Sequence, residues 1–579
     1  MIAILDFGGQ YVFNIKRNLN EMGFEAEVFP FDVSASLLKR KKVTGVILSG
    51  GPYSVYEKDA PVLKEEILEL DVPILGICYG HQLLATLIGG KVSSGLGEYG
   101  FTEVFKKVDD VLFNGWEKKE ICWMSHGDRV ESLPSSAKIL ASTGKTKIAA
   151  FVYKKLYGVQ FHPEVSHTPK GHILLKNFAQ HICGEKKRSW DVKSFVERSI
   201  KMIRKTVNGS RAVVAVSGGI DSTTLCLLGK RALGSKLIPI HIDTGFMRKN
   251  ESEKVVNALS SLGLDCKLIS AQEEFFQRVK DVEDLDERRR VIGEVFIRIL
   301  ERVSKDYGCE WLLQGTIAPD VIESTRGQSK RRKKSKHGGW IKLHHNVGGL
   351  PKDTNIGIIE PLRELFKYQV RLLAKHLGLP EEFLRRQPFP GPGLACRIGG
   401  KITREKVELL KEVTDIAERE LKKFNPSQYF AAIVEDEVTM NLNFPVAWRK
   451  KWFVNRIDIL SQKSIGVKGD ERLLGQISLI KPNDEFFGLD WLEVLKLQSE
   501  VTSFFKDVCR AVVITNESKG KYGIVLRAVD TKDFMTAMPT EIEWGSIKRL
   551  GEEIISKFPT VSFVGYEITT KPPSTIELF

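Results

Sequence analysis

A cysteine early in the chain is the first residue whose surroundings suggest covalent chemistry. Cys78 stands in "LGICYGHQ" (75–82), where a short β-rich run meets a helical pattern. The sequence therefore predicts a thiol on a sharp strand-to-helix turn, exposed and close to a helix N-terminus that favours the thiolate. A buried core cysteine is the commoner alternative in an apolar stretch, so a catalytic Cys78 needs partners elsewhere in the chain.

The segment "QFHPE" (160–164) supplies such partners. His162 could accept the thiol proton, and Glu164 could hold the imidazole in the required tautomer. Backbone N–H groups of "SGGP" (49–52) and of Tyr79 could form an oxyanion hole. Each of these motifs follows an apolar β-rich run, and it is the set rather than any single residue that favours a nucleophilic site.

A second kind of site is predicted in "SGGIDS" (217–222), which follows the apolar run "AVVAV" and opens a helix. Backbone N–H groups of a glycine turn at a helix N-terminus bind anions such as phosphates. The turn lacks the lysine of a G-x-x-x-x-G-K-[ST] loop, so it is a different phosphate loop. Asp221 is placed to help hold a Mg²⁺ ion on those phosphates.

The elements that would position these motifs form three blocks. Residues 1–185 alternate β-rich runs with helical patterns, such as those expected at 61–70 and 80–88, which predicts an α/β domain with its reactive turns at the strand ends. Residues 190–395 repeat that alternation and predict a second, parallel-sheet domain. Residues 396–579 mix strands and helices without it and predict an α+β domain. The charged stretch 184–192 and the Pro/Gly-rich elbow 386–400 are the expected boundaries.

Composition narrows the functional class. The chain has 579 residues, 42% hydrophobic and 28% charged, with a formal net charge of +14 that favours anionic partners. Eight cysteines without a C-x-x-C pair argue against a zinc ribbon or a disulfide framework and favour a reducing cytoplasm. The first residues predict a strand rather than a signal peptide, and no apolar run is long enough for a membrane span.

The cysteine, oxyanion and H-P-E motifs together resemble the class I glutamine amidotransferases over nearly all of residues 1–180. The resemblance implies that Cys78 is the nucleophile, His162 the base and Glu164 its orienter. It also implies that Gly51 and Tyr79 line the oxyanion site, and that Gln82 and "MSHGD" (124–128) lie near the glutamine. Such a domain releases ammonia through a glutamyl thioester.

The loop 217–222 and the strand "IHIDTGFMR" (240–248) resemble the ATP-pyrophosphatases of the adenine-nucleotide α-hydrolase-like fold. The resemblance implies ATP binding by Ser217, Gly218, Gly219, Ile220, Asp221 and Ser222, with Mg²⁺ as the cofactor at Asp221. These enzymes convert ATP to AMP and pyrophosphate and activate a carbonyl oxygen as its adenylate. One chain would then make both ammonia and the electrophile that receives it, which raises the effective concentration of ammonia.

End to end, the sequence resembles the GMP synthase family, through "QGTIAPDVIES", "HHNVGGLP", "FPGPGLACR" and "KPPSTIE" among other stretches. The family resemblance implies glutamine, ATP and XMP as substrates and a homodimer formed through residues 396–579. It implies XMP contacts from Arg289, Asp470, Lys571, Ile576 and Glu577. Asparagine synthetases, glutamine-dependent NAD synthetases and CTP synthase fit less well, because their glutaminase type or domain order differs.

Some segments depart from that family pattern. The basic stretch "KRRKKSK" (330–336) is longer and more charged than expected, and it is either a solvated surface loop or a lid over anionic nucleotides. Ser574 and the final Leu578-Phe579 replace the usual glycine and Trp-Glu. These departures concern the details of the XMP site rather than the reaction class.

Two other functional classes make different predictions. A sulfur- or nitrogen-inserting enzyme acting on tRNA would need a persulfide cysteine pair or an RNA-binding module, and the sequence shows neither, so we do not expect nucleic acid as a partner. A non-catalytic binding protein would have lost Cys78, His162 or Asp221, and all three are present.

Overall fold

The computed structural model describes residues 1–188, 190–318, 320, 356–387, 389–441, 444–468, 471–531 and 536–579. They form two compact units, the first consisting chiefly of Met1–Trp190 and the second chiefly of the rest of the chain. The basic stretch 330–336 and Asp470 lie outside the described residues.

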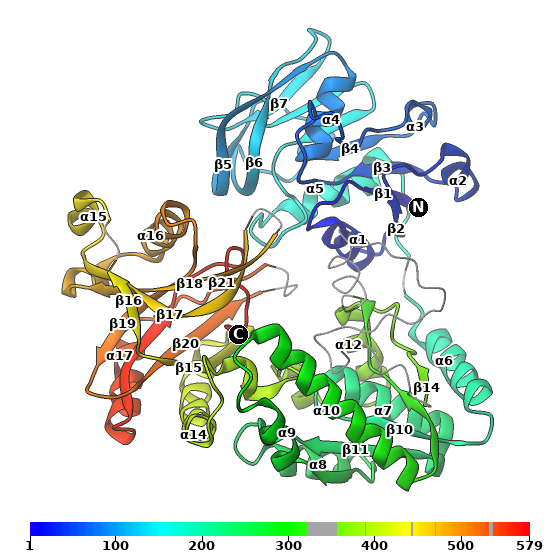
Figure 1. The fold of residues 1–579 in the computed structure, drawn as a ribbon. Helices are drawn as coiled ribbons and strands as arrows, with labels where there is room; N and C mark the ends of the chain where they lie inside the picture. The colour runs from blue at the N-terminus through cyan, green and yellow to red at the C-terminus, as the bar shows by residue number, and fades with distance from the viewer. Residues whose placement is uncertain are drawn as a thin grey trace. The chain divides into compact units, whose positions relative to one another are not determined.

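The first unit is built on a nine-stranded sheet, drawn in blue to cyan in Figure 1. Its order is β2-β1-β3-β4-β9-β8-β7-β5-β6, and the pairings from β2 to β9 are all parallel. The parallel strands are β1 (Ile2–Asp6), β2 (Ala26–Pro30), β3 (Gly45–Leu48), β4 (Ile74–Ile77) and β9 (Leu156–Val159). The antiparallel strands are β5 (Lys91–Lys106), β6 (Lys119–Ser132), β7 (Lys138–Ser142) and β8 (Ala150–Tyr153).

Alternate side chains of the parallel strands enter two separate cores. Ile2 and Ile4 pack with helices α1 (Val12–Glu21) and α5 (Gly171–Asn177). Their neighbours Ala3 and Leu5 pack on the other face with α4 (Tyr79–Leu87). Strands that are buried on both faces read as continuous apolar runs, so the sequence indicated β1, β3, β4 and β9. It did not indicate β2, which is only partly buried. The shorter elements of this unit are α2 (Ala35–Arg40), α3 (Glu65–Leu68), η1 (Val111–Phe113) and the π-helical turn η2 (Phe178–Ile182).

The helix expected at residues 61–70 is shorter than its sequence pattern suggests. Only Glu65–Leu68 is helical, as α3. The carbonyl of Pro61 accepts a hydrogen bond from the Tyr79 hydroxyl at 2.7 Å, and Leu63 is buried in the core. These tertiary contacts hold the first residues outside the helix despite their helical pattern.

The second unit contains a five-stranded sheet in the order β12-β11-β10-β13-β14, with every pairing parallel. Its strands are β10 (Arg211–Ala215), β11 (Leu237–Asp243), β12 (Lys267–Ser270), β13 (Cys309–Leu313) and β14 (Gly357–Ile359). The helices of this region include α6 (Val192–Val207), α7 (Ile220–Leu233), α8 (Glu251–Ser261), α9 (Gln272–Val279), α10 (Leu285–Asp306), α12 (Lys367–His376) and α13 (Glu381–Arg385). The expected parallel-sheet fold of this region is confirmed.

The C-terminal part of the second unit is a mixed sheet in the order β15-β20-β22-β19-β18-β17-β16, to which β21 (Met538–Pro539) adds at β20. Its long strands are β15 (Gln428–Glu435), β17 (Val454–Lys468), β18 (Glu471–Pro482), β19 (Val508–Glu517), β20 (Tyr522–Asp530) and β22 (Val561–Glu567), with β16 (Val438–Asn441) at one edge. Helices α14 (Arg404–Leu421), α15 (Val446–Lys451), α16 (Trp491–Phe504) and α17 (Trp544–Lys557) accompany them. This is the α+β pattern that the sequence predicts.

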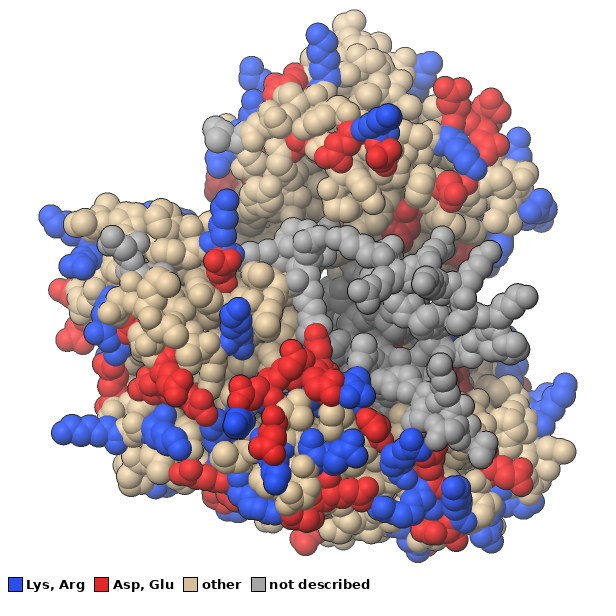
Figure 2. Space-filling view, viewed as in Figure 1, with Lys and Arg blue, Asp and Glu red and all other residues tan. Residues whose placement is uncertain are grey.

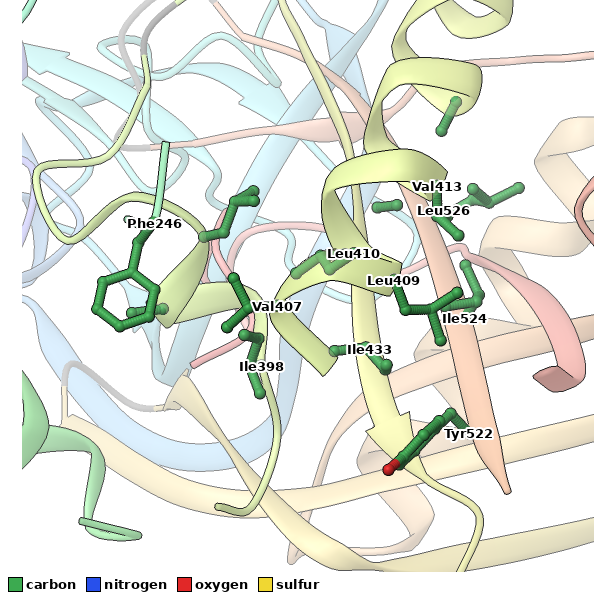
Figure 3. Packing of buried hydrophobic residues seen from close by; sticks show 14 of the residues in the cluster. Phe246, Ile398, Val407, Leu409, Leu410, Val413, Ile433, Tyr522, Ile524 and Leu526 are labelled. Atoms are coloured by element: carbon green, nitrogen blue, oxygen red, sulfur yellow. The ribbon is translucent and has the colours of Figure 1, made fainter. Parts of the chain in front are cut away.

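The two sheets of the second unit share one apolar core. Helix α14 contributes Val407 and Leu410, and Figure 3 shows Val407 beside Ile398, and Leu410 on the side of Ile433 and the β20 residues. The predicted elbow is part of this core, because Gly393–Arg397 forms a buried 3₁₀ helix, η4. The backbone N–H of Leu394 donates to the carbonyl of Phe246 at 2.7 Å. The boundary at 395/396 stays a prediction.

Charged side chains of both signs cover the face seen in Figure 2. Lys and Arg are interspersed with Asp and Glu over the described surface, without one dominant basic patch in this view. Among the described residues, none of the helices combines the length and apolar character that crossing a lipid bilayer requires.

Candidate active sites

Cys78 lies at a sharp turn between β4 and α4, as the sequence predicts. Its backbone has φ 52° and ψ −101°, which is an unusual conformation for a residue other than glycine and marks a strained position. The turn is possible because Gly76 and Gly80 approach each other. A Cβ on Gly76 would lie 2.3 Å from the carbonyl oxygen of Gly80. The side chain is only 6% exposed, so the sulfur is more enclosed than the sequence suggested.

His162 and Glu164 form a buried pair beside this turn. His162 Nδ1 lies 2.8 Å from Glu164 Oε1, which fixes Nδ1 as the donor and leaves Nε2 for a second partner. A Cβ placed on Gly50 would lie 3.3 Å from His162 Cε1 and 3.7 Å from Cys78 Cβ, so the imidazole and the cysteine flank the same glycine. The structure therefore brings together the three residues predicted to react.

Electrostatics favour a positively charged His162. Burial alone would lower its pKa, but the charges of Glu164 and of the Cys78 thiolate, with hydrogen bonds to both side chains, raise the pKa well above 6.5. An imidazolium next to a thiolate is the form in which the proton has already moved from sulfur to nitrogen. The pair is thus suited to nucleophilic attack followed by protonation of a leaving group.

The three residues expected around the glutamine substrate, Gly51, Tyr79 and Gln82, differ in what their side chains or backbone contact. Gly51 packs closely against the residue that follows β1, because a Cβ on Gly51 would lie 2.6 Å from the carbonyl oxygen of Phe7. The Tyr79 side chain points into the core, and burial, with the nearby Glu57 and Tyr53, raises its pKa to about 12. Tyr79 can therefore serve an oxyanion only through its backbone N–H, at the first turn of α4. Gln82 is buried and donates its amide to the carbonyl of Asp128 at 2.8 Å.

The "MSHGD" stretch lies in β6 and contacts the cysteine turn. Cys78 Sγ lies 3.6 Å from the carbonyl oxygen of Ser125. His126 Nδ1 donates to the carbonyl of Asp128 at 2.8 Å, while its Nε2 lies 3.4 Å from a carboxylate oxygen of buried Glu98. These contacts fix the backbone of residues 125–128 next to the sulfur.

The loop 217–222 joins β10 to α7. Gly218 has φ +78°, and the Ser222 hydroxyl accepts from the Ser217 N–H at 3.2 Å and donates to the Gly219 carbonyl at 3.2 Å. Ile220 packs into an apolar cluster with Ala374, Leu379 and Phe383, so it can meet a ligand only through its backbone. The loop is thus a folded turn at a helix N-terminus, as a phosphate site requires.

Two basic residues at this loop were missed by the sequence analysis. Lys367, at the start of α12, forms an ion pair with Asp221 Oδ2. Arg386 donates to the carbonyl of Gly218 at 2.9 Å and pairs with Glu251. Both lie more than 140 residues from the loop in sequence, and only the segments "ELFK" and "LRRQPFP" could have signalled them.

Asp221 also has an oxygen that fits a metal ion. Its Oδ1 is buried and accepts no hydrogen bond, whereas Oδ2 is held by Lys367. A buried carboxylate oxygen without a partner is costly unless a ligand meets it, and Mg²⁺ prefers such oxygens. Among the described residues, no three His, Cys, Asp or Glu side chains gather into a group able to hold a metal by themselves.

The residues predicted for XMP converge at the chain end, apart from Asp470, which is outside the described residues. Arg289, on α10, donates to the backbone oxygen of Phe579 at 2.5 Å. Lys571 pairs through its backbone with Ala537, and Ile576 is buried. The tail is therefore an ordered part of the second unit.

Buried arginines hold this tail, and the sequence analysis did not single them out. Arg397 donates Nε and Nη2 to the two carboxylate oxygens of Glu577, at 2.9 and 3.0 Å. Arg510 donates to the carbonyls of Thr575 and Glu577, at 3.1 and 2.6 Å. Arg527 donates to the hydroxyl of Ser574 at 2.9 Å, so the serine found in place of the expected glycine is built into the network.

Comparison with known proteins decides the family. Residues 3–182 match the family model "Glutamine amidotransferase class-I", and residues 491–578 match "GMP synthase C terminal domain". The chain is 39% identical over its full length to a glutamine-hydrolysing GMP synthase of Caldanaerobacter subterraneus subsp. tengcongensis, covering 98% of that protein. The chain belongs to the GMP synthase family. The glutamine-hydrolysing GMP synthase of Caldicellulosiruptor saccharolyticus is 40% identical, and that of Pyrobaculum aerophilum 38%; both alignments span this whole chain and 99% of the relative.

Membership in the GMP synthase family confirms the resemblance drawn from the sequence motifs. It also confirms the expected fold class, a class I glutaminase followed by a parallel-sheet domain and the GMP synthase C-terminal domain. The chain is therefore an enzyme of GMP synthesis with glutamine as its nitrogen source.

Proposed function

We propose that this enzyme divides GMP synthesis between two sites with the residues placed above. Residues 1–185 release ammonia from glutamine, residues 190–395 use ATP to adenylate XMP, and residues 396–579 help bind XMP and form a homodimer. Ammonia displaces AMP to give GMP, and pyrophosphate is the other product. The observation that carries the proposal is the strained Cys78 turn next to the buried His162–Glu164 pair, in a chain whose relatives match it over its full length.

At the glutaminase site, Cys78 Sγ attacks the carboxamide carbon of glutamine. His162 holds the proton taken from the thiol and gives it to the departing ammonia, and Glu164 stabilises the imidazolium until that transfer. Backbone N–H groups at Gly51 and Tyr79 stabilise the oxyanion, and Gln82 binds glutamine. Water then attacks the thioester carbon, the C–S bond breaks, and glutamate leaves.

At the synthetase site, the backbone of residues 217–222 grips the phosphates of ATP. Asp221 would hold Mg²⁺ through its unpartnered Oδ1, and the ion, when bound, would neutralise charge on the phosphate oxygens. Lys367 and Arg386 add positive charge around the loop. At the chain end, the cations Arg289 and Lys571 match the 5′-phosphate of XMP, with Ile576, Glu577 and Asp470 as further contacts. Scattered free cysteines favour a cytoplasmic location.

The direct test is to incubate the purified enzyme with XMP, ATP and Mg²⁺, and either glutamine or ammonium. We expect GMP, AMP and pyrophosphate with both nitrogen sources, and glutamate only with glutamine. Formation of ADP and orthophosphate, or failure to consume XMP, would overturn the proposal.

Replacing Glu164 by glutamine is expected to change the pH dependence of the glutaminase. The charge of Glu164 helps raise the pKa of His162, so the folded protein favours the protonated ring. The resulting contribution to stability is complete below pH 6.5, and it is lost as the pH rises through the pKa of His162 in the folded state. In Glu164→Gln, His162 loses its proton at lower pH. The rate of glutamate release should fall by about 100-fold at neutral pH, and the alkaline limb of its pH profile should move to lower pH.

The measurement is the pH profile of glutamate release by Glu164→Gln and by the unsubstituted enzyme, at the same saturating concentrations of XMP and ATP. The ratio of the two rates at each pH removes any pH dependence that the synthetase imposes on both enzymes. An alkaline limb that stays in place would mean that Glu164 does not set the charge of His162.

Glu577→Gln is expected to weaken XMP binding. The glutamine keeps one acceptor for Arg397 but removes the negative charge that this buried arginine meets. Because the charge-assisted hydrogen bonds between Arg397 and residue 577 are weakened, the KM for XMP should rise about tenfold. Alkylation of Cys78 should be unchanged. Glu517→Gln, at an exposed carboxylate that pairs with Lys481 on the C-terminal sheet, is the matched control. An unchanged KM for XMP in Glu577→Gln would remove Glu577 from the proposed site.

A further inference from the structure

A buried side-chain amide touches the reactive sulfur and has no role in the mechanism above. Gln160 follows strand β9, two residues before His162, and is fully buried. Its Nε2 lies 3.7 Å from Cys78 Sγ, within hydrogen-bond range for sulfur. Its Oε1 lies 3.3 Å from Nε2 of Gln82.

The neighbouring groups fix which end of the Gln160 amide faces the sulfur. A backbone carbonyl can only accept hydrogen bonds, so the end of Gln82 that lies 2.8 Å from the carbonyl of Asp128 must be its NH₂ group. That NH₂ group has a second proton, which points to Gln160. Gln160 must therefore present its oxygen to Gln82 and its NH₂ group to Cys78.

The carbonyl of Asp128, which accepts from Gln82, is fixed as well. The oxygen of Asp128 also accepts from His126 Nδ1 at 2.8 Å, and the backbone N–H of Gln160 donates to the carbonyl of Ala149 at 2.8 Å. The series of hydrogen bonds from Asp128 through Gln82 to Gln160 thus begins at a backbone carbonyl, which can only accept, and the main chain of Gln160 is held in place by its bond to Ala149. Rotating the Gln160 amide by half a turn would place two NH₂ groups face to face, so the observed direction is the stable one.

We propose that Gln160 donates its side-chain N–H to the sulfur of Cys78 and stabilises the thiolate, and that Gln82 sets the direction of this donation. The inference rests on the proposed role of Cys78 as the glutaminase nucleophile. A hydrogen bond to an ionised acceptor is stronger than one to a neutral acceptor, so the donor favours the thiolate over the thiol. It needs no movement during the reaction, because the amide is already oriented.

The same geometry restricts what Gln82 can do for the substrate. Both protons of its NH₂ group are used, one on Asp128 and one on Gln160. Gln82 can therefore meet glutamine only through its own Oε1, as an acceptor. It would recognise an N–H group of the substrate, either the carboxamide or the α-ammonium, and not its carboxylate.

Two substitutions separate donation to sulfur from simple filling of space. Gln160→Met keeps the length and lacks both polar groups, whereas Gln160→Glu keeps the acceptor for Gln82 and places an oxygen instead of an N–H against the sulfur. The readout is the pH dependence of Cys78 alkylation by iodoacetamide in the full-length enzyme, followed by mass spectrometry of the Cys78 peptide. Ammonia-dependent GMP synthesis by the same samples reports whether the chain is folded.

The midpoint of alkylation should rise by about one pH unit in Gln160→Met, and further in Gln160→Glu, which corresponds to about a tenfold loss of thiolate at neutral pH. Glutamine-dependent synthesis should fall as the thiolate fraction of Cys78 falls, while ammonia-dependent synthesis is retained. Unchanged midpoints in both folded variants would overturn the inference, even if activity is lost. If alkylating Cys78 in the unsubstituted enzyme left glutamine use intact, the proposed function itself would fail instead.

Discussion

A Cys78→Ala variant is expected to lose glutamine-dependent GMP synthesis by at least about 10³-fold, while synthesis from ammonium stays within about twofold of the unsubstituted enzyme. The thiol forms the covalent bond to glutamine, so its loss cannot be compensated by binding. The synthetase residues lie in a separate compact unit and keep their geometry. The measurement is GMP formation with saturating glutamine and, separately, with saturating ammonium at a pH that supplies free ammonia.

Cys122→Ala is the matched control, because it removes a thiol from the same domain. Cys122 is buried in β6, and burial raises the pKa of its thiol, so it is not expected to react. Its glutamine-dependent rate should resemble that of the unsubstituted enzyme. Loss of both activities in Cys78→Ala, with an intact fold, would contradict the separation of the two sites.

The second large effect is expected for Asp221→Asn. The substitution removes the carboxylate whose free oxygen fits Mg²⁺ and whose other oxygen pairs with Lys367. Pyrophosphate release should fall by about 100-fold or more with both glutamine and ammonium, since charge neutralisation on the phosphates is lost. The concentration of Mg²⁺ needed for half-maximal rate should also rise.

Asp265→Asn tests whether the effect is specific. Asp265 is an exposed carboxylate of the same domain that pairs with Lys267 at 2.8 Å, and its removal should leave both rates unchanged. Alkylation of Cys78 should remain normal in Asp221→Asn, which shows that the glutaminase site is intact. An Asp221→Asn enzyme that still releases pyrophosphate at the full rate would remove this residue from the metal site.

The sequence was most informative where chemistry depends on local structure. Cys78 follows a buried strand and precedes a helix, and His162 and Glu164 stand two residues apart, so a single turn and a single segment place them. The phosphate loop is equally local, because glycine, a β-strand and a helix N-terminus all occur within a few residues. Such signals need no knowledge of tertiary structure.

Residues that act across the fold could not be found in this way. Lys367 meets Asp221, and Arg397 meets Glu577, only after segments 146 and 180 residues apart have packed together. Gln160 stands in the same "QFHPE" segment as His162, and a polar side chain two residues before the histidine is the signal that could have found it. Which end of the Gln160 amide faces the sulfur, however, depends on Gln82 and the carbonyl of Asp128, and only the three-dimensional structure shows these contacts.

Adenylation of the XMP carbonyl, at a site apart from the thiol, is the central step of the proposed function. XMP labelled with ¹⁸O at the purine carbonyl that becomes the amino-bearing carbon tests this step directly, with mass spectrometry of the nucleotides after turnover with ammonium. Adenylation predicts one ¹⁸O atom in each AMP released and none in pyrophosphate. Unlabelled AMP, or label found in orthophosphate together with ADP, would contradict it.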